Sequence, residues 1–428
     1  MSVRVVHIEA KTGTEARAAA EVRALAPPPQ AVEEDVRAIV GAVRARGDEA
    51  VRELTARFDG ADVPPERLRV SPEEIRAAMD TLDPGFAEAL EAAIANVRAV
   101  ARASLRPTAE VDLPAGQRVE VAELPVRRAG AYVPGGRAPY ASTVVMCAVT
   151  AREAGVDELA VCAPPGPDGE AHPAIVGACG LCGVDEVYRM GGAQAIAALA
   201  YGTGTVPGVD TIVGPGSAYV QEAKRQVFGR VGLDGIAGPS ELVVIASEGA
   251  APELAALDLL AQAEHGTGSL LACVSHSLAL LEELERAVGE LAPASPTAPE
   301  ADLPPLALVR ASGPAAAVAL GDLIAPEHME LIGTEVEALA GEVRAAGALF
   351  VGSGAATAFG DYVAGSNHVL PTGGAARHAS ALGVATFRRR MARIEVPEEA
   401  AASLAPAGAT LARAEGFALH AESMERRA

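Results

Sequence analysis

Residues 142–166, STVVMCAVTAREAGVDELAVCAPPG, decide the fold class. Ser142 to Glu153 is an apolar run of helical length closed by Gly155, and Glu158 to Ala163 is a short apolar strand that ends at prolines. The alternation continues, with expected strands at 186–190 and 211–213 and expected helices at 172–181, 193–201 and 217–228. Because helices separate successive strands, we expect a mostly parallel sheet with right-handed crossovers.

A second stretch repeats this alternation further along the chain. A strand at 241–246, ELVVIA, precedes a long helix at 252–265, and the later expected elements are a strand at 269–275, a helix near Glu327 and a strand at 348–351. The 428 residues are too many for one ordinary core. We therefore predict an α/β fold of two Rossmann-like lobes with a cleft between them.

Charge and hydropathy exclude several classes of function. The chain carries 35 basic and 56 acidic residues, and its formal charge of -21 repels nucleic acid and anionic membranes. Lysine occurs only at Lys11 and Lys224, which leaves few candidates for a Schiff-base mechanism. The start, MSVRVVHIEA, lacks a signal-peptide pattern, and no apolar run reaches the roughly 18 residues of a membrane helix. We expect a cytoplasmic protein with neither nucleic acid nor membrane as a partner.

The five cysteines have two interpretations. They lie mostly among alanines and valines, as buried thiols do. Cys179 and Cys182 form a CGLC pair that could be redox-active or half of a zinc site, but the sequence has no second such pair. The pattern favours plain packing.

Three glycine turns stand where expected strands meet expected helices, at 133–142, 190–196 and 213–220. A helix that starts at such a turn offers free backbone N–H groups and a partial positive charge to a phosphate. None of the three is a GxGxxG fingerprint with an acidic residue about twenty positions later. The turns alone therefore leave two readings open, dinucleotide binding and ordinary tight turns.

Two further fragments carry residue types suited to chemistry. Gln262 and His265 are three apart near the end of the helix at 252–265, so they share one face; taken alone, a surface glutamine and a capping histidine explain them as well. Glu327 and His328 follow Pro326, a residue typical of a first helical turn. A helix N-terminus there would keep His328 neutral and able to accept a proton, although a capped helix with exposed Glu and His remains the alternative.

Four segments resemble the histidinol dehydrogenase family, and the resemblance runs from about Val32 to the C-terminus. They are LDLLAQAEHG at 257–266, APEHMEL at 325–331, FGDYVAGSNHVLPTGG at 359–374 and ARAEGFALHAES at 412–423. The resemblance implies oxidation of L-histidinol to L-histidine through L-histidinal with reduction of two NAD, the last step of histidine biosynthesis. It also implies a zinc ion, and the mixed nitrogen and oxygen set suits zinc with an open position for substrate. The implied zinc ligands are Gln262, His265, Asp361 and His420.

The resemblance also assigns roles to individual residues. His328 is the implied general base of both oxidations, and Glu327 the residue that activates water. Tyr132, Gln194 and Ser217 fall on NAD contacts, although the family usually has asparagine at the position of Ser217. His368 is expected to line the pocket. The implied substrate contacts are Ser240, Gln262, His265, His328, Asp361, Glu415 and His420.

In the family the C-terminal segment crosses a homodimer, so Glu415 and His420 are expected to serve the partner's active site. Small helical segments at both termini should take part in dimerisation. The expected division is an N-terminal segment at 1–30, a zinc-binding and catalytic lobe at 31–126 and 240–373, an NAD-binding lobe at 127–239, and a C-terminal segment at 374–428 that reaches the partner.

Three rival functions remain at this point. The first is a related zinc- and NAD-dependent dehydrogenase that oxidises a different alcohol, against which Ser240 and Glu415 argue. The second is a zinc hydrolase, which the lack of an HExxH motif disfavours. A non-catalytic scaffold is the weakest, because the catalytic letters are intact.

Overall fold

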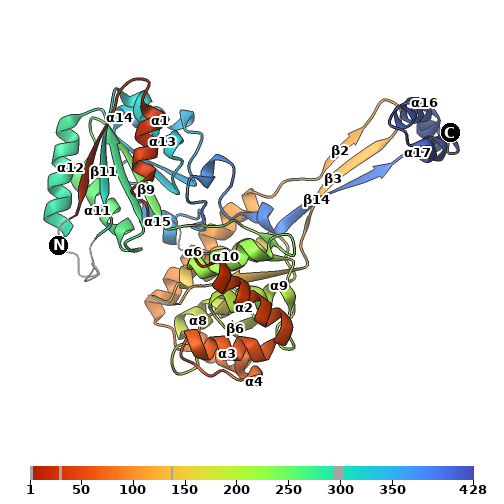
Figure 1. Cartoon of the computed structure of the whole chain (residues 1–428), viewed down its shortest axis with the longest axis horizontal. Helices are drawn as coiled ribbons and strands as arrows, with labels where there is room; N and C mark the ends of the chain where they lie inside the picture. The colour runs from red at the N-terminus through yellow and green to blue at the C-terminus, as the bar shows by residue number, and fades with distance from the viewer. Residues whose placement is uncertain (1–2, 28–30, 136–137, 293–302) are drawn as a thin grey trace.

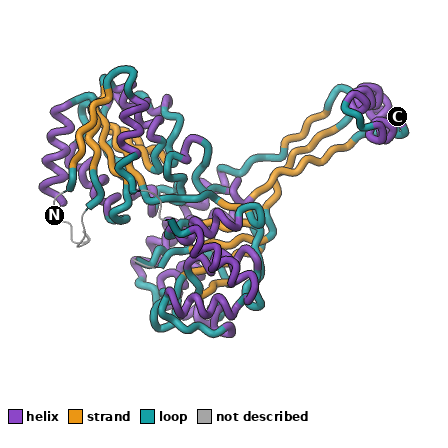
Figure 2. The backbone as a smooth tube through the Cα atoms, viewed as in Figure 1, coloured by secondary structure: helices purple, strands orange, loops and turns teal. Residues whose placement is uncertain are grey.

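The protein consists of two α/β lobes and a long arm that projects away from both (Figure 1). The computed structural model describes residues 3–27, 31–135, 138–292 and 303–428. Both lobes contain a parallel sheet covered by helices, whereas the arm is an antiparallel ribbon that ends in two helices (Figure 2).

The first lobe has, within the described residues, a parallel sheet of six strands. Three of its four central strands are buried along their whole length, as expected for strands covered on both faces. In spatial order the strands are β1 (Val5–Ala10), β11 (Leu306–Ala311), β10 (Leu270–Ser275), β9 (Glu241–Ala246), β12 (His328–Ile332) and β13 (Ala348–Val351). The lobe's helices are α1 (Glu15–Arg23) and α13 (Pro314–Ile324) on one face, α11 (Pro252–Ala263) and α12 (Leu278–Leu291) on the other, and the shorter α14 (Thr334–Glu337), η2 (Ala340–Glu342) and α15 (Thr357–Tyr362).

The second lobe contains a smaller parallel sheet, of five strands where the chain is described. In spatial order these are β6 (Glu186–Arg189), β5 (Glu158–Ala163), β4 (Arg128–Tyr132), β7 (Thr211–Val213) and β8 (Gly232–Leu233). One face packs against α5 (Pro72–Asp80), α6 (Pro84–Ala103), α7 (Ala141–Glu153) and α8 (Pro173–Leu181). The other packs against α2 (Glu33–Arg46), α3 (Asp48–Phe58), α9 (Gly192–Tyr201) and α10 (Ala218–Val227), with the short α4 (Pro65–Leu68) beside β6.

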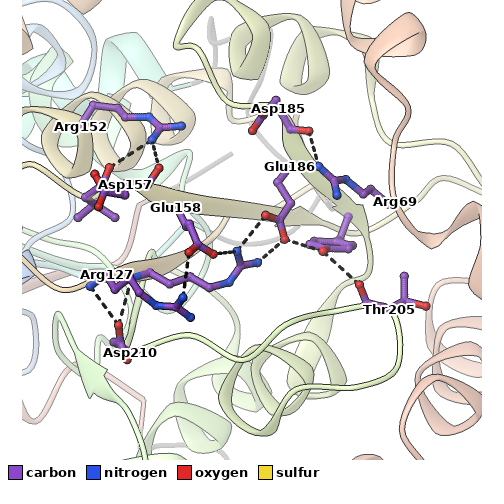
Figure 3. Close-up of polar contacts among 12 residues, drawn as sticks. Arg69, Arg127, Arg152, Asp157, Glu158, Asp185, Glu186, Thr205 and Asp210 are labelled. Atoms are coloured by element: carbon purple, nitrogen blue, oxygen red, sulfur yellow. Dashed lines mark hydrogen bonds and ion pairs between the residues drawn. The ribbon is translucent and has the colours of Figure 1, made fainter.

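The amino ends of the second sheet are closed by a network of charges (Figure 3). The buried Arg128 guanidinium donates from Nη1 to Glu158 Oε2 at 2.9 Å and to Glu186 Oε2 at 3.0 Å. The backbone N–H groups of Arg127 and Arg128 donate to Asp210 Oδ2. Since these charged side chains pair mainly with one another, this end of the sheet is structural and the opposite end is left for a ligand.

The arm joins two segments that lie far apart in the sequence. Strand β3 (Arg118–Pro125) pairs antiparallel with both β2 (Ala109–Asp112) and β14 (Arg388–Glu395). The chain reaches β14 through the 3-10 helices η3 (Ala375–Arg377) and η4 (Val384–Phe387). Beyond the ribbon, α16 (Glu398–Ala414) packs against α17 (Ala418–Glu425) (Figure 1).

The predicted α/β fold is confirmed, and most predicted strands and helices are found within one or two residues of their expected bounds. The helix expected near Glu327 is wrong, because that residue directly precedes strand β12. The buried cysteines are confirmed: all five are free and buried, and burial raises the pKa of Cys179 and of Cys182. None of the helices in the described part of the chain is both long and apolar enough to cross a membrane.

The structure groups the elements differently from the predicted division. Helices α2 to α6 cover the second sheet, not the first lobe, because their apolar faces join its two cores. Residues 3–27 are not a separate segment, since β1 pairs with β11 and α1 packs on α13. Residues 109–125 belong to the arm. An amphipathic stripe shows that a helix must be covered, but it does not say by which sheet.

Candidate active site

A pocket of about 360 Å³ lies where the two lobes meet. The second lobe contributes the turn at 214–216, which follows the carboxyl end of β7. The first lobe contributes Ser240 and Glu327, which directly precede β9 and β12. His368 and residues 369–372 complete one wall. The pocket therefore joins the carboxyl ends of one parallel sheet to the amino ends of the other.

His328 is the first residue of β12 and is 3% exposed. Its Nδ1 lies 3.1 Å from the carbonyl oxygen of Glu241 and 3.4 Å from Glu327 Oε2, and its Nε2 lies 3.7 Å from Asp361 Oδ1. Burial alone lowers the pKa of this imidazole, but the Glu327 and Asp361 carboxylates raise it more, to about 10. The expectation that a helix N-terminus keeps His328 neutral is therefore wrong, because no helix starts there.

Glu327 is buried beside His328 and is held by Glu241 in a reciprocal pair of hydrogen bonds. Glu241 N donates to Glu327 Oε2 at 2.8 Å, and Glu327 N donates to Glu241 Oε2 at 3.2 Å. Glu327 is 6% exposed and still lines the pocket, so its carboxylate is both fixed and accessible to a small ligand.

Asp361, in α15, stands among histidines. Burial raises the pKa of its carboxyl group, but the neighbouring His328 imidazole more than offsets burial and the net shift is downward. His368 and His265 act in the same direction, so both lie near this carboxylate. His368 Nδ1 is 2.8 Å from the Asp361 carbonyl oxygen and its Nε2 is 3.1 Å from Thr143 Oγ1, which places it in the pocket wall as expected.

Gln262 lies on α11, which packs against α15. Its side chain is buried, yet its Nε2 finds no hydrogen-bond partner among the described residues. Buried amide groups are nearly always paired, and the amide nitrogen and oxygen exchange places by a simple flip. An unpaired buried amide end on the helix that packs against α15 therefore fits a ligand that the described residues do not supply.

His420 and Glu415 are not brought to this pocket by their own chain. Both are exposed on the helices at the far end of the arm, where the ring of His420 lies 5.1 Å from that of Phe417 (Figure 1). Consistent with this separation, the described residues of one chain hold no group of three His, Cys, Asp or Glu side chains placed to bind a metal ion. Of the expected zinc ligands, His265 lies near Asp361 and Gln262 is on the helix α11 that packs against α15, whereas His420 lies at the far end of the arm.

The expected NAD contacts lie at two turns of the second lobe. Tyr132 OH accepts a hydrogen bond from Gly192 N at 3.3 Å, and Gln194 Nε2 donates to Asp59 Oδ2 at 3.4 Å. Both side chains are buried, and burial raises the pKa of the Tyr132 phenol. Ser217 precedes α10 and is exposed, with no capping hydrogen bond from its side chain. In the first glycine turn, residues 136 and 137 lie outside the described residues.

Four residues that support the site were not identified from the sequence. Glu241 holds Glu327 and His328, Asp59 holds Gln194, and the buried pair of Lys224 and Asp234 holds the turn at Gly214. The sequence did offer a reason to single out Lys224, because the chain has two lysines and one of them falls within an amphipathic helix. The others act through contacts between distant segments, which spacing does not reveal.

Comparisons with known proteins agree with this geometry. A family model described as histidinol dehydrogenase matches residues 26–428. The chain is 43% identical over 403 residues to a histidinol dehydrogenase of Gluconobacter oxydans, covering 93% of each chain. It is 45% identical over 400 residues to one from a Synechococcus species, covering 92% of each. A crystal structure of histidinol dehydrogenase from Elizabethkingia anophelis superposes with a TM-score of 0.92 at 29% identity, covering 99% of this chain and 98% of that one.

Both the family match and the relatives extend over the lobes, the pocket and the arm. The chain is an NAD-dependent oxidoreductase and belongs to the histidinol dehydrogenase family.

Proposed function

We propose that this enzyme oxidises L-histidinol to L-histidine through L-histidinal, with reduction of two NAD, as the last step of histidine biosynthesis. The observation that carries the proposal is a buried pair of which Glu327 lines the pocket opposite the glycine turn of the other lobe. Its neighbour His328 lies 3.4 Å from Glu327 and 3.7 Å from Asp361. A buried base next to a buried carboxylate matches a reaction that must remove two kinds of proton, one from a hydroxyl group and one from water.

His328 acts as the general base at its Nε2 atom. A backbone carbonyl can only accept a hydrogen bond, so the Glu241 oxygen at 3.1 Å keeps a proton on Nδ1. With Nδ1 protonated, Nε2, which faces Asp361 at 3.7 Å, is the ring nitrogen that exchanges a proton with the substrate. Nε2 then takes the hydroxyl proton of the alcohol in the first oxidation and that of the aldehyde hydrate in the second.

Glu327 takes the proton from the water that adds to the aldehyde. Its carboxylate faces the pocket while the Glu241 backbone N–H fixes one oxygen, which leaves the other free for water. The hydrate that forms has the oxidation level needed for the second oxidation. Both oxidations therefore use one site, without release of the aldehyde between them.

Zinc would be held by Gln262, His265 and Asp361 of one chain and by His420 of a partner. The unpaired Gln262 amide and the Asp361 carboxylate among imidazoles fit this ion, because zinc accepts nitrogen and carboxylate or amide oxygen ligands. When bound, zinc orients the imidazole and amine of the substrate and NAD accepts the hydride. Ser240 at the pocket wall and a partner's Glu415 would complete the substrate contacts, the carboxylate matching a cationic amine.

Tyr132, Gln194 and Ser217 would hold NAD on the second lobe. Tyr132 and Gln194 lie at one turn, and the exposed Ser217 hydroxyl stands at the start of α10, next to the turn at 214–216 that lines the pocket. Helix starts of this kind suit a pyrophosphate. The arrangement supports a cofactor that reaches from the second lobe toward Glu327.

The proposal includes a homodimer with shared active sites. The arm and its helices expose apolar side chains that a single chain leaves uncovered, with Ile394 64%, Leu411 66% and Leu419 77% exposed. Exposed apolar surface of this kind marks protein–protein contacts. A partner that covers the arm could also receive His420 and Glu415. We place the enzyme in the cytoplasm, where its five buried thiols would remain reduced.

The first test counts NADH formed per substrate consumed by the purified, zinc-loaded enzyme with L-histidinol and excess NAD. We expect two NADH per histidinol, loss of activity with a chelator, and recovery on return of zinc. Absence of NADH formation by folded, metal-loaded protein would contradict the proposal and point to a relative that oxidises a different alcohol.

A further inference from the structure

Glu241 contacts both catalytic residues through three of its own groups. Its backbone N–H and its carboxylate form the reciprocal pair with Glu327, and its carbonyl oxygen faces Nδ1 of His328. Its other carboxylate oxygen accepts from Gly373 N at 3.0 Å, next to the pocket wall at 369–372. Glu241 is 4% exposed, so this negative charge needs a buried counter-charge.

Arg23 supplies that charge from the last turn of α1. Its Nη1 pairs with Glu241 Oε1. Its Nε donates to the carbonyl oxygen of Ile324 at 2.8 Å and its Nη2 to that of Ala325 at 2.9 Å. The rigid fork of the guanidinium thus joins the carboxyl end of α13 to the amino end of β9. Along the chain, the end of α13 lies about 300 positions from Arg23, and Glu241 lies 218 positions from it.

The backbone that Arg23 holds is strained. Ala325 has φ 50 and a left-handed conformation, and among the described residues other than glycine it alone has a positive φ. It is fully buried and is followed directly by Pro326, Glu327 and His328. Such a conformation persists when the surroundings over-determine it, and it occurs mostly at functional sites. The direction in which Glu327 and His328 leave this turn therefore depends on what fixes residues 324 and 325.

We propose that Arg23 and Glu241 are positioning residues that fix the turn at 324–326 and thereby hold Glu327 and His328 in register for the reaction. The inference rests on the proposed function, because it assumes that these two residues are catalytic. Arg23 is absent from the pocket lining and contacts the catalytic residues only through Glu241 and the turn at 324–325, so its effect is on the rate of the chemical steps and not on substrate or NAD affinity.

The test compares variants of one helix. Arg23→Met removes the charge and the donors, Arg23→Lys keeps the charge without the fork, and Arg17→Met removes an exposed arginine of α1 that pairs with Glu21. For Arg23→Met we expect the kcat of the folded enzyme to fall by roughly 10²-fold, with KM for L-histidinol and NAD and zinc content near wild type. The melting temperature should fall as well, because the buried Glu241 carboxylate loses its counter-charge, so kcat is measured well below that temperature. Arg23→Lys should recover part of this loss, and Arg17→Met should match the wild type. Glu241→Gln keeps the backbone contacts and should lower kcat less than Arg23→Met.

The outcomes separate the inference from the proposed function. If the wild type forms no NADH from L-histidinol, the proposed function fails. If the wild type is active and Arg23→Met keeps its kcat, the positioning role is overturned while the function stands. The role is also overturned if the loss of kcat in Arg23→Met matches a loss of zinc or of folded protein, or if Arg23→Lys is no better than Arg23→Met.

Discussion

Asp59 is a half-buried acid behind two of the proposed NAD contacts. Its carboxylate accepts from Gln194 Nε2, and burial raises its pKa to about 6 from an ordinary value of 3.8. The folded state therefore prefers the protonated acid. The resulting contribution to stability is complete below pH 3.8 and is lost as the pH rises through about 6. Asp59 thus weakens the fold at neutral pH while it orients Gln194.

The variant Asp59→Asn should be stabilised relative to wild type as the pH rises, because the amide keeps an acceptor for Gln194 and never ionises. We expect the difference in free energy of unfolding to grow by roughly 1–2 kcal/mol between pH 4 and pH 7.5, after allowance for solvent screening of a partly exposed group. Urea unfolding at both values measures it. Asp62→Asn is the control: Arg52 lowers the pKa of Asp62 below 3.8, so this carboxylate is ionised in both states across the interval and its variant should show almost no such change. Equal changes in both variants would refute the assignment.

At the scale of elements, strands β7 and β8 and helix α10 are joined around one glycine. Gly214 has φ +112, and a Cβ there would lie 2.1 Å from the Tyr132 carbonyl oxygen, so no other residue fits. Its N–H donates to Asp234 Oδ2 at 2.7 Å, and its carbonyl accepts from Lys224 Nζ at 3.0 Å. Lys224 and Asp234 are both almost fully buried and form an ion pair. This pair fixes the turn that faces Glu327 across the pocket.

Lys224→Met should therefore destabilise the fold by about 3–5 kcal/mol, because it leaves the Asp234 carboxylate buried without a counter-charge. Lys11→Met, at the other lysine of the chain and exposed, is the matched control and should change stability by less than about 0.5 kcal/mol. Adding Asp234→Asn to Lys224→Met should restore part of the loss. Denaturant unfolding of the wild type, Lys224→Met, Asp234→Asn and the double variant measures the coupling energy. Equal stability of the two lysine variants would show that the pair does not hold the turn.

At the scale of the whole molecule, the implied zinc ligands lie at two separate places within one chain, the first lobe and the end of the arm. The arm holds His420 away from Gln262, His265 and Asp361, so a complete site requires a second copy under the proposed dimer (Figure 1). If the sites are shared, a dimer of two different inactive chains contains one site with both defects and one intact site.

Mixing inactive Gln262→Ala with inactive His420→Ala should therefore restore about a quarter of wild-type activity after random exchange of chains. Mixing Gln262→Ala with Asp361→Ala is the control and should restore none. Each chain then carries a defect in the lobe that forms its own site, so neither site is intact. Activity of the mixture, with exchange verified by mass tags, decides the point. Recovery in the control and the test alike, or in neither, would contradict shared sites.

The sequence by itself determined the α/β class, most of the strands and helices between residues 141 and 275 together with β13, and the letters of the candidate site. It did so because fully buried strands need continuous apolar runs and because the helices between them need caps and glycine stops. Only the tertiary structure decided that α2 to α6 cover the second lobe, that Glu327 and His328 begin a strand, and that Arg23 and Glu241 hold them. These features depend on which apolar helix face packs against which sheet and on contacts between segments hundreds of residues apart. The hydrophobic pattern of a single segment predicts neither.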